Sequence, residues 1–305
     1  MTITIINLLI LLTIPFFMMG IIKKTKAFWA GRKGVSILQP FYDFLRLMNK
    51  ETVYSETTSW VFKLTPMIMF STVIFAALFI PLLTGEAIIN VPFSFVIFSY
   101  TLSLGKFFSL ISALDTGSSF EGMGASREAC FSTIVEPAFF IAMGSVAALT
   151  KVNSFDNLKM IAENAPVYGI LIIALLIITL FIMLLIEGCR VPVDDPATHL
   201  ELTMIHEVMI LDNSGADLGF ISWSSAIKMF LFEALIASLI IPKGLAPVIS
   251  IPLFLGAILL LSVMVGTIEA ITARFRMTHV FEFVFIMSIT ALLILTLVTY
   301  GIYGN

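Results

Sequence analysis

Long apolar stretches without a single charged residue constrain this chain more than any other feature of its sequence. Five stretches lack Asp, Glu, Lys and Arg, namely residues 1–22, 64–85, 164–186, 244–268 and 283–305. Each is long enough to cross a hydrocarbon layer of roughly 30 Å, which takes about 20 helical residues. Hydrocarbon offers no partners to backbone amides, and the alternating pattern of a transmembrane barrel is missing, so we expect helices.

Three further apolar stretches are each interrupted by a charge: 91–114 contains Lys106, 129–150 contains Glu136 and 228–241 contains Glu233. Of the 305 residues, 59% are hydrophobic and only 12% charged, about half the charged fraction of ordinary soluble domains. We therefore predict an all-α polytopic membrane protein with about eight transmembrane helices in a single membrane domain, residues 1–305.

Basic residues are distributed unevenly among the connections between these spans. If the N-terminus lies outside, the cytoplasmic loops are 23–65, 115–127, 188–228 and 269–280. They hold 13 of the 17 Lys and Arg residues, against three in the opposite loops. The positive-inside rule favours this topology, which places both termini on the outer side.

Several classes of function find no support in the sequence. The net charge of −3 gives no bulk basicity for binding nucleic acid. Cys130 and Cys189 are solitary, and the three histidines lack metal-ligand spacing. We expect no metal site and no redox cofactor bound by this chain.

Ionisable residues inside the predicted spans require an explanation, because a charge at helix-centre depth costs roughly 3 kcal/mol on insertion scales. Glu136 and Glu233 are the buried acids, and Lys106 is the base. Pro137 follows Glu136 and could bend its helix. These residues have the composition of a proton relay and equally of a static buried ion pair, and the sequence leaves both open.

Three loop segments combine charge with apolar residues. Residues 112–127 contain glycines and serines that we expect to interrupt the helix, giving either a capped turn or a charged entrance. Residues 187–218 contain two prolines followed by apolar residues, which predicts packing against the membrane domain or a partner. Residues 28–65 alternate basic and aromatic residues, as in an amphipathic helix on anionic headgroups or a docking surface for a soluble subunit.

The same segments carry a family resemblance. GRKGVSILQPFYDFLRLMNKE, GASREA followed by Glu136, E-x-x-R-x-P-x-D from Glu187 to Asp194, and the acid-x-Ser-Gly element from Asp212 to Gly215 resemble subunit 1 of respiratory complex I. They also resemble its relatives in formate hydrogenlyase and other membrane-bound nickel–iron (NiFe) hydrogenases. The resemblance covers nearly the whole chain and implies eight spans with both termini outside.

Within this family, the sequence is more similar to the hydrogenase-type branch. Val193, Ala197 and His199 stand where the quinone-reducing pattern has Phe and two further carboxylates. The resemblance implies a multi-pass subunit of a prokaryotic cytoplasmic (inner) membrane, with no catalytic centre of its own. Soluble large and small hydrogenase-like subunits, carrying iron–sulfur clusters and a NiFe centre, would dock on its cytoplasmic face. Antiporter-like subunits would lie beside it in the bilayer.

The resemblance also implies roles for individual residues. A path for protons or sodium ions would be formed by Asp115, Glu121, Glu136, Glu187, Glu201 and Glu207, and continued by Lys106 and Glu233. Arg127, Arg190, Asp194 and Asp195 would hold the loops through ion pairs. Arg32, Lys33, Gln39 and Asp43 would contact the soluble arm. Two alternatives stay open: a quinone-site subunit of an NADH:quinone oxidoreductase, and a stand-alone secondary ion transporter.

Overall fold

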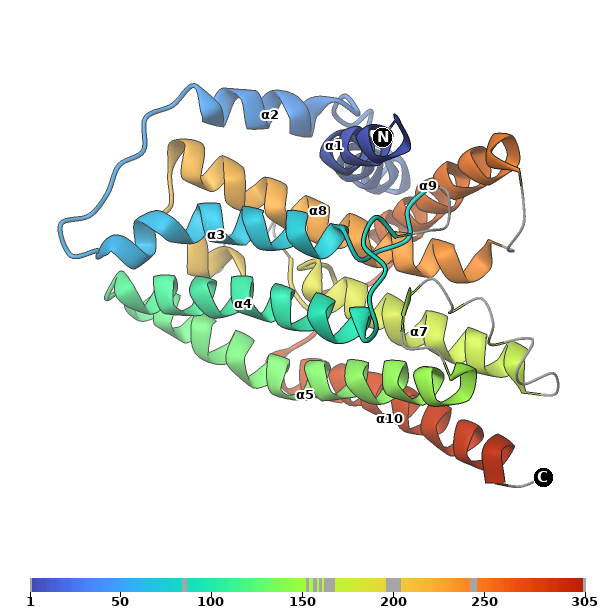
Figure 1. Cartoon of the computed structure of the whole chain (residues 1–305). Helices are drawn as coiled ribbons and strands as arrows, with labels where there is room; N and C mark the ends of the chain where they lie inside the picture. The colour runs from blue at the N-terminus through green and yellow to red at the C-terminus, as the bar shows by residue number, and fades with distance from the viewer. Residues whose placement is uncertain are drawn as a thin grey trace.

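The computed structural model describes residues 2–83, 87–151, 154–155, 158, 161, 168–195, 204–241 and 246–303. Across these residues it contains helices and no strands (Figure 1). Eight helices are long and apolar enough to cross a membrane, which confirms the predicted fold class. They are α1 (Thr2–Trp29), α3 (Trp60–Ala77), α4 (Ser94–Asp115), α5 (Ser119–Thr150), α7 (Gly169–Glu187), α8 (Gly215–Ile240), α9 (Pro247–Ile271) and α10 (Met277–Tyr303).

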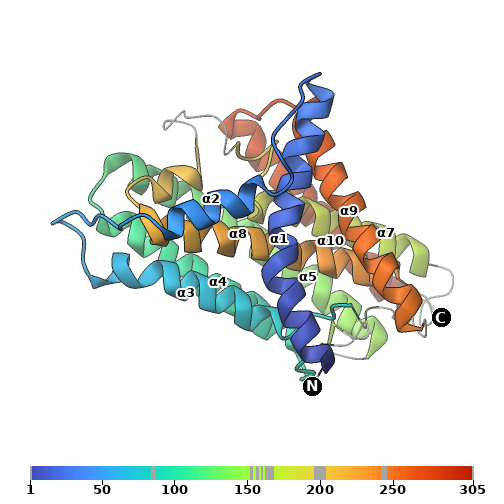
Figure 2. The ribbon, with the colours of Figure 1, turned by 90° about the horizontal axis from the view of Figure 1, so that it is seen from above.

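Two short elements lie outside these spans. The amphipathic helix α2 (Gln39–Met48) begins with Pro40 in its first turn, where a missing N–H costs nothing. It lies over α8 and packs beside α1 (Figure 2). The 3-10 helix η2 (Glu207–Ile210) packs on α5 and α4. The helix predicted within residues 28–65 is therefore present, although α2 rests on other helices as well as presenting an outer face.

Helix α8 lies at the centre of the bundle. Of its most apolar window, 72% is buried, against 28% for the peripheral α9. It packs against α1, α2, α3, α7 and α9. The central position explains why α8 is apolar on all sides yet accommodates a glutamate and a lysine: other helices, not lipid, surround it.

Two predicted loop boundaries were wrong. Residues 112–127 are mostly helical, because α4 continues to Asp115, only residues 116–118 form a link, and α5 begins at Ser119. Glu121 lies in the first turn of α5, where the helix dipole favours a negative charge. Likewise, α8 begins at Gly215, so the last third of the predicted loop 188–228 is helix. The helix α5 also continues through Pro137.

The connections 30–59, 116–118 and 272–276 meet at one end of the bundle with residues 188–195 and 204–214. The amide of Ser59 donates to Asp115 at 2.7 Å, and that of Val53 donates to the Ser214 hydroxyl at 2.9 Å. The amide of Phe275 donates to the carbonyl of Pro192 at 3.0 Å. We call this end of the molecule the charged end, because it gathers most of the basic residues.

Candidate functional site

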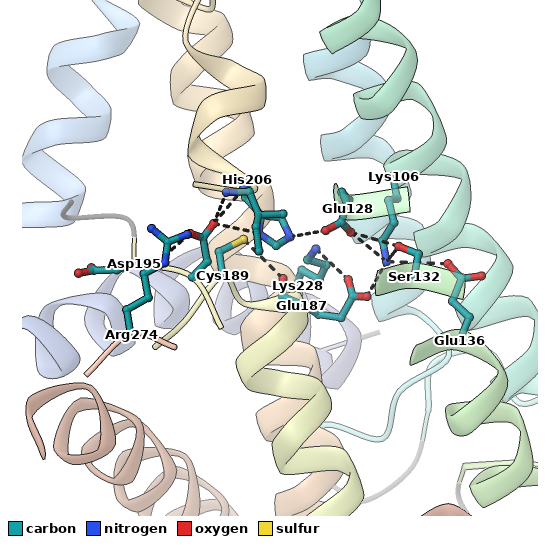
Figure 3. A network of polar contacts seen from close by, with 12 residues as sticks. Lys106, Glu128, Ser132, Glu136, Glu187, Cys189, Asp195, His206, Lys228 and Arg274 are labelled. Atoms are coloured by element: carbon teal, nitrogen blue, oxygen red, sulfur yellow. Dashed lines mark hydrogen bonds and ion pairs between the residues drawn. The ribbon is translucent and has the colours of Figure 1, made fainter. Parts of the chain in front are cut away.

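Lys106 of α4 is the centre of a buried ionisable cluster. Its ammonium lies 2.5 Å from Oε1 of Glu187, 3.4 Å from Glu128 and 3.8 Å from Glu136, and it donates to the hydroxyl of Ser132 at 3.0 Å (Figure 3). Glu128, Ser132 and Glu136 come from one face of α5, and Glu187 is the last residue of α7. Three spans therefore converge on one cation.

Lys228 of α8 adds a second cation to this cluster. Its Nζ lies 3.1 Å from Oε2 of Glu187, so the two oxygens of that carboxylate face two different lysines. Glu128 and Glu187 are buried, whereas the side chain of Glu136 is 29% exposed. Removing charges from water costs several kcal/mol per ion, and close opposite charges with additional hydrogen bonds offset that cost.

The cluster extends from α5 into the loop after α7 through His206. The Nε2 atom of His206 lies 3.0 Å from Glu128, and its Nδ1 lies 3.3 Å from Asp194. Asp194 also accepts from the backbone amides of Ile205 and His206, and it pairs with Arg274 at 3.1 Å. One carboxylate therefore fastens residues 204–206 and the connection between α9 and α10.

These contacts shift the protonation equilibria of the two loop residues. Burial favours a protonated Asp194, but the hydrogen bonds and charge of His206 and the charge of Arg274 outweigh it and lower the pKa of Asp194. Burial likewise disfavours a charged imidazole, but the neighbouring Cys189 and Glu128 and the hydrogen bond to Asp194 hold the pKa of His206 well above its usual range. A doubly protonated His206 suits two carboxylate neighbours.

A second group of charges lies between α1 and α9. Glu269 of α9 is 2.9 Å from Lys26 of α1 and 3.2 Å from Arg190 in the loop after α7. The side chain of Glu269 is fully buried, and Nε of Arg190 has no hydrogen-bond partner among the described residues. The loop 188–195 therefore bridges two ionisable groups, through Arg190 at one end and Asp194 at the other.

A cavity of about 720 Å³ joins both groups to the charged end. Its wall includes Lys23 and Val35, which are exposed, and further in Trp223, whose buried Nε1 has no hydrogen-bond partner in the part of the chain that the structure describes. Phe16, Phe44 and Trp223 form an aromatic cluster along the wall, in which Phe16 stacks on Trp223. The inner lining reaches charged residues of both groups: Lys106, Glu128, His206, Lys228, Lys26, Arg190 and Glu269.

The structure brings together some of the predicted path residues and separates others. Lys106, Glu136 and Glu187 are in contact. Glu233 is fully buried between α8 and α9 and accepts from the Ser262 hydroxyl, at 3.1 and 3.4 Å. Glu207 lines the cavity. Glu201 lies outside the described residues, as do Ala197 and His199.

Other predicted residues hold the backbone at the charged end. Asp115 accepts from the Ser59 amide, and Glu121 accepts from the Asp212 amide at 3.0 Å. Arg127 donates to the carbonyl of Met204 at 2.8 Å. The amide of Asp195 donates to the Asp194 carboxylate.

Two of the predicted docking residues lie at the outer surface of the charged end, whereas Gln39 and Asp43 are half-buried, and Asp43 lines the cavity. Arg32 and Lys33 are exposed, and the Lys33 carbonyl accepts from Lys24. Gln39 donates to Asp43 at 2.8 Å within α2.

Sequence reasoning missed four members of the cluster. Glu128 carried a signal, since Glu128, Ser132 and Glu136 are spaced by four and so share a helix face. His206, Lys228 and Arg274 gave none, because their roles depend on how the loops fold back onto α5. Among the described residues, no group of three or more His, Cys, Asp and Glu side chains is arranged to hold a metal ion.

Eight apolar spans surround a buried cluster of charged residues that a cavity connects to the charged end. This arrangement defines a polytopic membrane protein that holds ionisable groups within its membrane-spanning part. The chain belongs to the NADH dehydrogenase family, whose sequence model matches residues 1–300. This result confirms the resemblance seen in the sequence, and with the spans it confirms a multi-pass protein of the inner membrane.

Three relatives and one solved structure are similar to most of this chain or to a large part of it. The chain is 26% identical to formate hydrogenlyase subunit 4 of Escherichia coli, over 78% of this chain and 77% of that protein. It is 27% identical to Escherichia coli hydrogenase-4 component C, over 88% and 86%. A subunit of the NADH-quinone oxidoreductase of Anaplasma marginale is 26% identical, over 61% and 58%. A chain of the archaeal membrane-bound sulfane sulfur reductase shares the fold, with a TM-score of 0.79, 20% identity, and coverage of 98% of this chain and 100% of that one.

Proposed function

We propose that this chain is the membrane-anchoring and ion-coupling subunit of a multisubunit hydrogenase- or formate hydrogenlyase-type complex. Two relatives are components of formate hydrogenlyase and hydrogenase-4, and they match most of this chain. Soluble large and small subunits with iron–sulfur clusters and a NiFe centre would carry out the redox chemistry. Antiporter-like subunits would share the bilayer, and both groups of partners are part of the proposal.

The observation that carries this proposal is the convergence of Glu128, Glu136 and Glu187 on Lys106. Where several carboxylates share few cations, a carboxylate that leaves a cation can be replaced by another, which limits the cost of leaving a buried charge unpaired. Lys228 and His206 provide neighbouring sites at 3.1 and 3.0 Å for the same carboxylates. A change at the docked arm would thereby shift which carboxylate is paired, and a proton or sodium ion would move with the unpaired charge.

The charged end indicates on which side of the membrane this path begins. We propose that it faces the cytoplasm, with both termini on the other side, since it carries most of the basic residues. Asp115, Glu121 and Glu207 would line the approach to the cluster. Glu233 would act as a separate buried acid, linked to the path only after a rearrangement of α8 against α9.

The test is Glu136→Gln in the purified, reconstituted complex. Glu136 is the most exposed of the three carboxylates and the farthest from Lys106, so its removal disturbs folding least. We expect electron transfer to persist while ion translocation per electron falls at least about tenfold. Glu282→Gln, at a 72% exposed side chain of α10, should leave both unchanged. Full coupled translocation by the Glu136 variant would refute its role.

A second candidate, a quinone-site subunit, is favoured by the cavity. Its volume of about 720 Å³ falls within the range of roughly 300–1,000 Å³ typical of small-molecule sites. One relative is itself named as a subunit of an NADH-quinone oxidoreductase. Purification in mild detergent separates the candidates: nickel with hydrogen evolution supports the first, NADH-dependent quinone reduction the second, and ion flux by a lone monomer a transporter.

A further inference from the structure

His206 lies between two carboxylates that belong to different parts of the chain. Nε2 faces Glu128 on α5 at 3.0 Å (Figure 3), and Nδ1 faces Asp194 in the loop after α7 at 3.3 Å. A neutral imidazole donates one hydrogen bond, whereas an imidazolium donates two. Both contacts can therefore be hydrogen bonds only while the ring carries two protons.

Charged groups surround this arrangement from every element packed on it. Lys106 of α4 lies 3.4 Å from Glu128, and Arg274 lies 3.1 Å from Asp194. Arg127 of α5 donates to the carbonyl of Met204, two residues before the histidine. Lys228 of α8 acts on Glu128, and Cys189 lies against the ring. Each of the two carboxylates therefore has at least one cation near it besides His206.

We infer that His206 is a proton-controlled clamp that joins residues 188–195 and 204–210 to α5. With two protons, the ring holds Glu128 and Asp194 together. After losing one, it keeps a single hydrogen bond, and its bare nitrogen faces an oxygen of the other carboxylate. That second contact is then repulsive, and the loop separates from α5.

The clamp rests on the proposed function for its role in coupling. Glu128 belongs to the Lys106 cluster, and Asp194 belongs to the loop that also carries Arg190 and its contact with Glu269. Opening the clamp would free Glu128 to shift toward Lys106 and Lys228. His206 is thus a positioning residue that links the charged end to the buried carboxylates.

Hydrogen–deuterium exchange of the full chain in detergent tests the clamp without any transport assay. The amides of Ile205 and His206 donate to Asp194 at 3.1 and 2.9 Å, so a peptide spanning 204–210 reports directly on the loop. After correction for base catalysis, we expect its exchange to rise at least about tenfold as the pH passes through the raised pKa of His206. In His206→Gln, exchange should be fast throughout, with no such step.

Two controls make the result decisive. The amide of Asp212 donates to Glu121 in the same connection, so a peptide spanning 211–214 should show no step in the wild-type chain. His279→Gln, which removes an exposed histidine paired with Glu282 on α10, should keep the wild-type profile at 204–210. A wild-type peptide without a step, or a step retained in His206→Gln, would overturn the clamp. Should the variant fail to fold, the wild-type profile decides alone. Absence of ion transport by the assembled complex would refute the proposed function and leave the clamp standing.

Discussion

Lys106 lies at a depth where an unpaired ammonium would cost roughly 3 kcal/mol or more. Its side chain is only 11% exposed, yet three carboxylates and a hydroxyl surround it. The excess of acids over this one lysine is balanced by Lys228 and by a charged His206. Neutrality of the whole group thus depends on residues that come from α8 and from a loop, not from α4 and α5 alone.

The pH dependence of stability at Asp194 follows from the same contacts. Its pKa is lowered in the folded chain, so its contribution is present above the ordinary value of about 3.9 and is lost as the pH falls through the folded value. The contribution of His206, whose pKa is raised, is full below about 6.5 and is lost as the pH rises through its folded value. The two residues therefore bound a window of stability from opposite sides.

We predict that Asp194→Asn narrows this window at its alkaline edge. The substitution removes a carboxylate that helps to hold the proton on His206, so the pKa of His206 falls and stability is lost at a lower pH than in the wild type. Breaking the buried pair with Arg274 should also cost about 3 kcal/mol near neutral pH. Melting temperatures measured across the pH range check both effects, with Glu282→Gln as the exposed control. An unchanged alkaline edge would contradict the assignment.

At the level of elements, the packing of α5 on residues 204–210 depends on Gly124. A Cβ built there would collide with Cγ1 of Val208 and lie 2.8 Å from the carbonyl oxygen of Ile205. The absence of a side chain lets the loop approach the helix closely, which places His206 against Glu128 four residues further along α5. A glycine that we expected to interrupt a helix is instead a contact point within one.

We predict that Gly124→Ala destabilises the chain by about 1–3 kcal/mol, because the loop must move away from α5. Alanine is the better helix former by about 1 kcal/mol, so any loss arises from packing. Gly144→Ala, on the same helix with nothing within 4 Å of the added Cβ, should stabilise by up to about 1 kcal/mol. Thermal unfolding of the two variants side by side gives the comparison, and equal effects would rule out close packing at Gly124.

The elements differ in how far the sequence predicts them. Hydropathy identified all eight spans, because a helix that crosses lipid needs a minimum length and an apolar composition, and both can be read from the sequence. It misplaced the ends of α5 and α8, since glycine and charge are tolerated in helices that pack on protein. The sequence could not predict which buried polar side chains contact each other. The contact of Glu233 with Ser262 and the position of His206 depend on how the helices are rotated and how the loops fold, and neither produces a periodic pattern in the sequence.

At the scale of the whole molecule, the charge clusters, the cavity and the exposed basic residues share one end. Helix α1 runs at a steep angle to α8, and α2 lies over α8 beside α1 (Figure 2). The cavity runs from exposed Lys23 and Val35 down to Lys106. A partner resting on this end would cover the mouth of the cavity and touch the loops that carry Arg190 and Asp194, so docking and the state of the buried carboxylates would be linked.

We predict that reversing two charges on this end, Arg32→Glu together with Lys33→Glu, weakens attachment of the soluble arm roughly tenfold. Both side chains are exposed, and reversing exposed charges that face a complementary surface slows association and changes the dependence of binding on salt. The measurement is the nickel content and hydrogen evolution that co-purify with the tagged chain across a series of salt concentrations. Lys151→Glu, at an exposed residue that follows α5 at the opposite end, is the matched control. Nickel retention identical to the wild type at low salt would show that the arm docks elsewhere, while loss of nickel in both variants would indicate general instability of the complex.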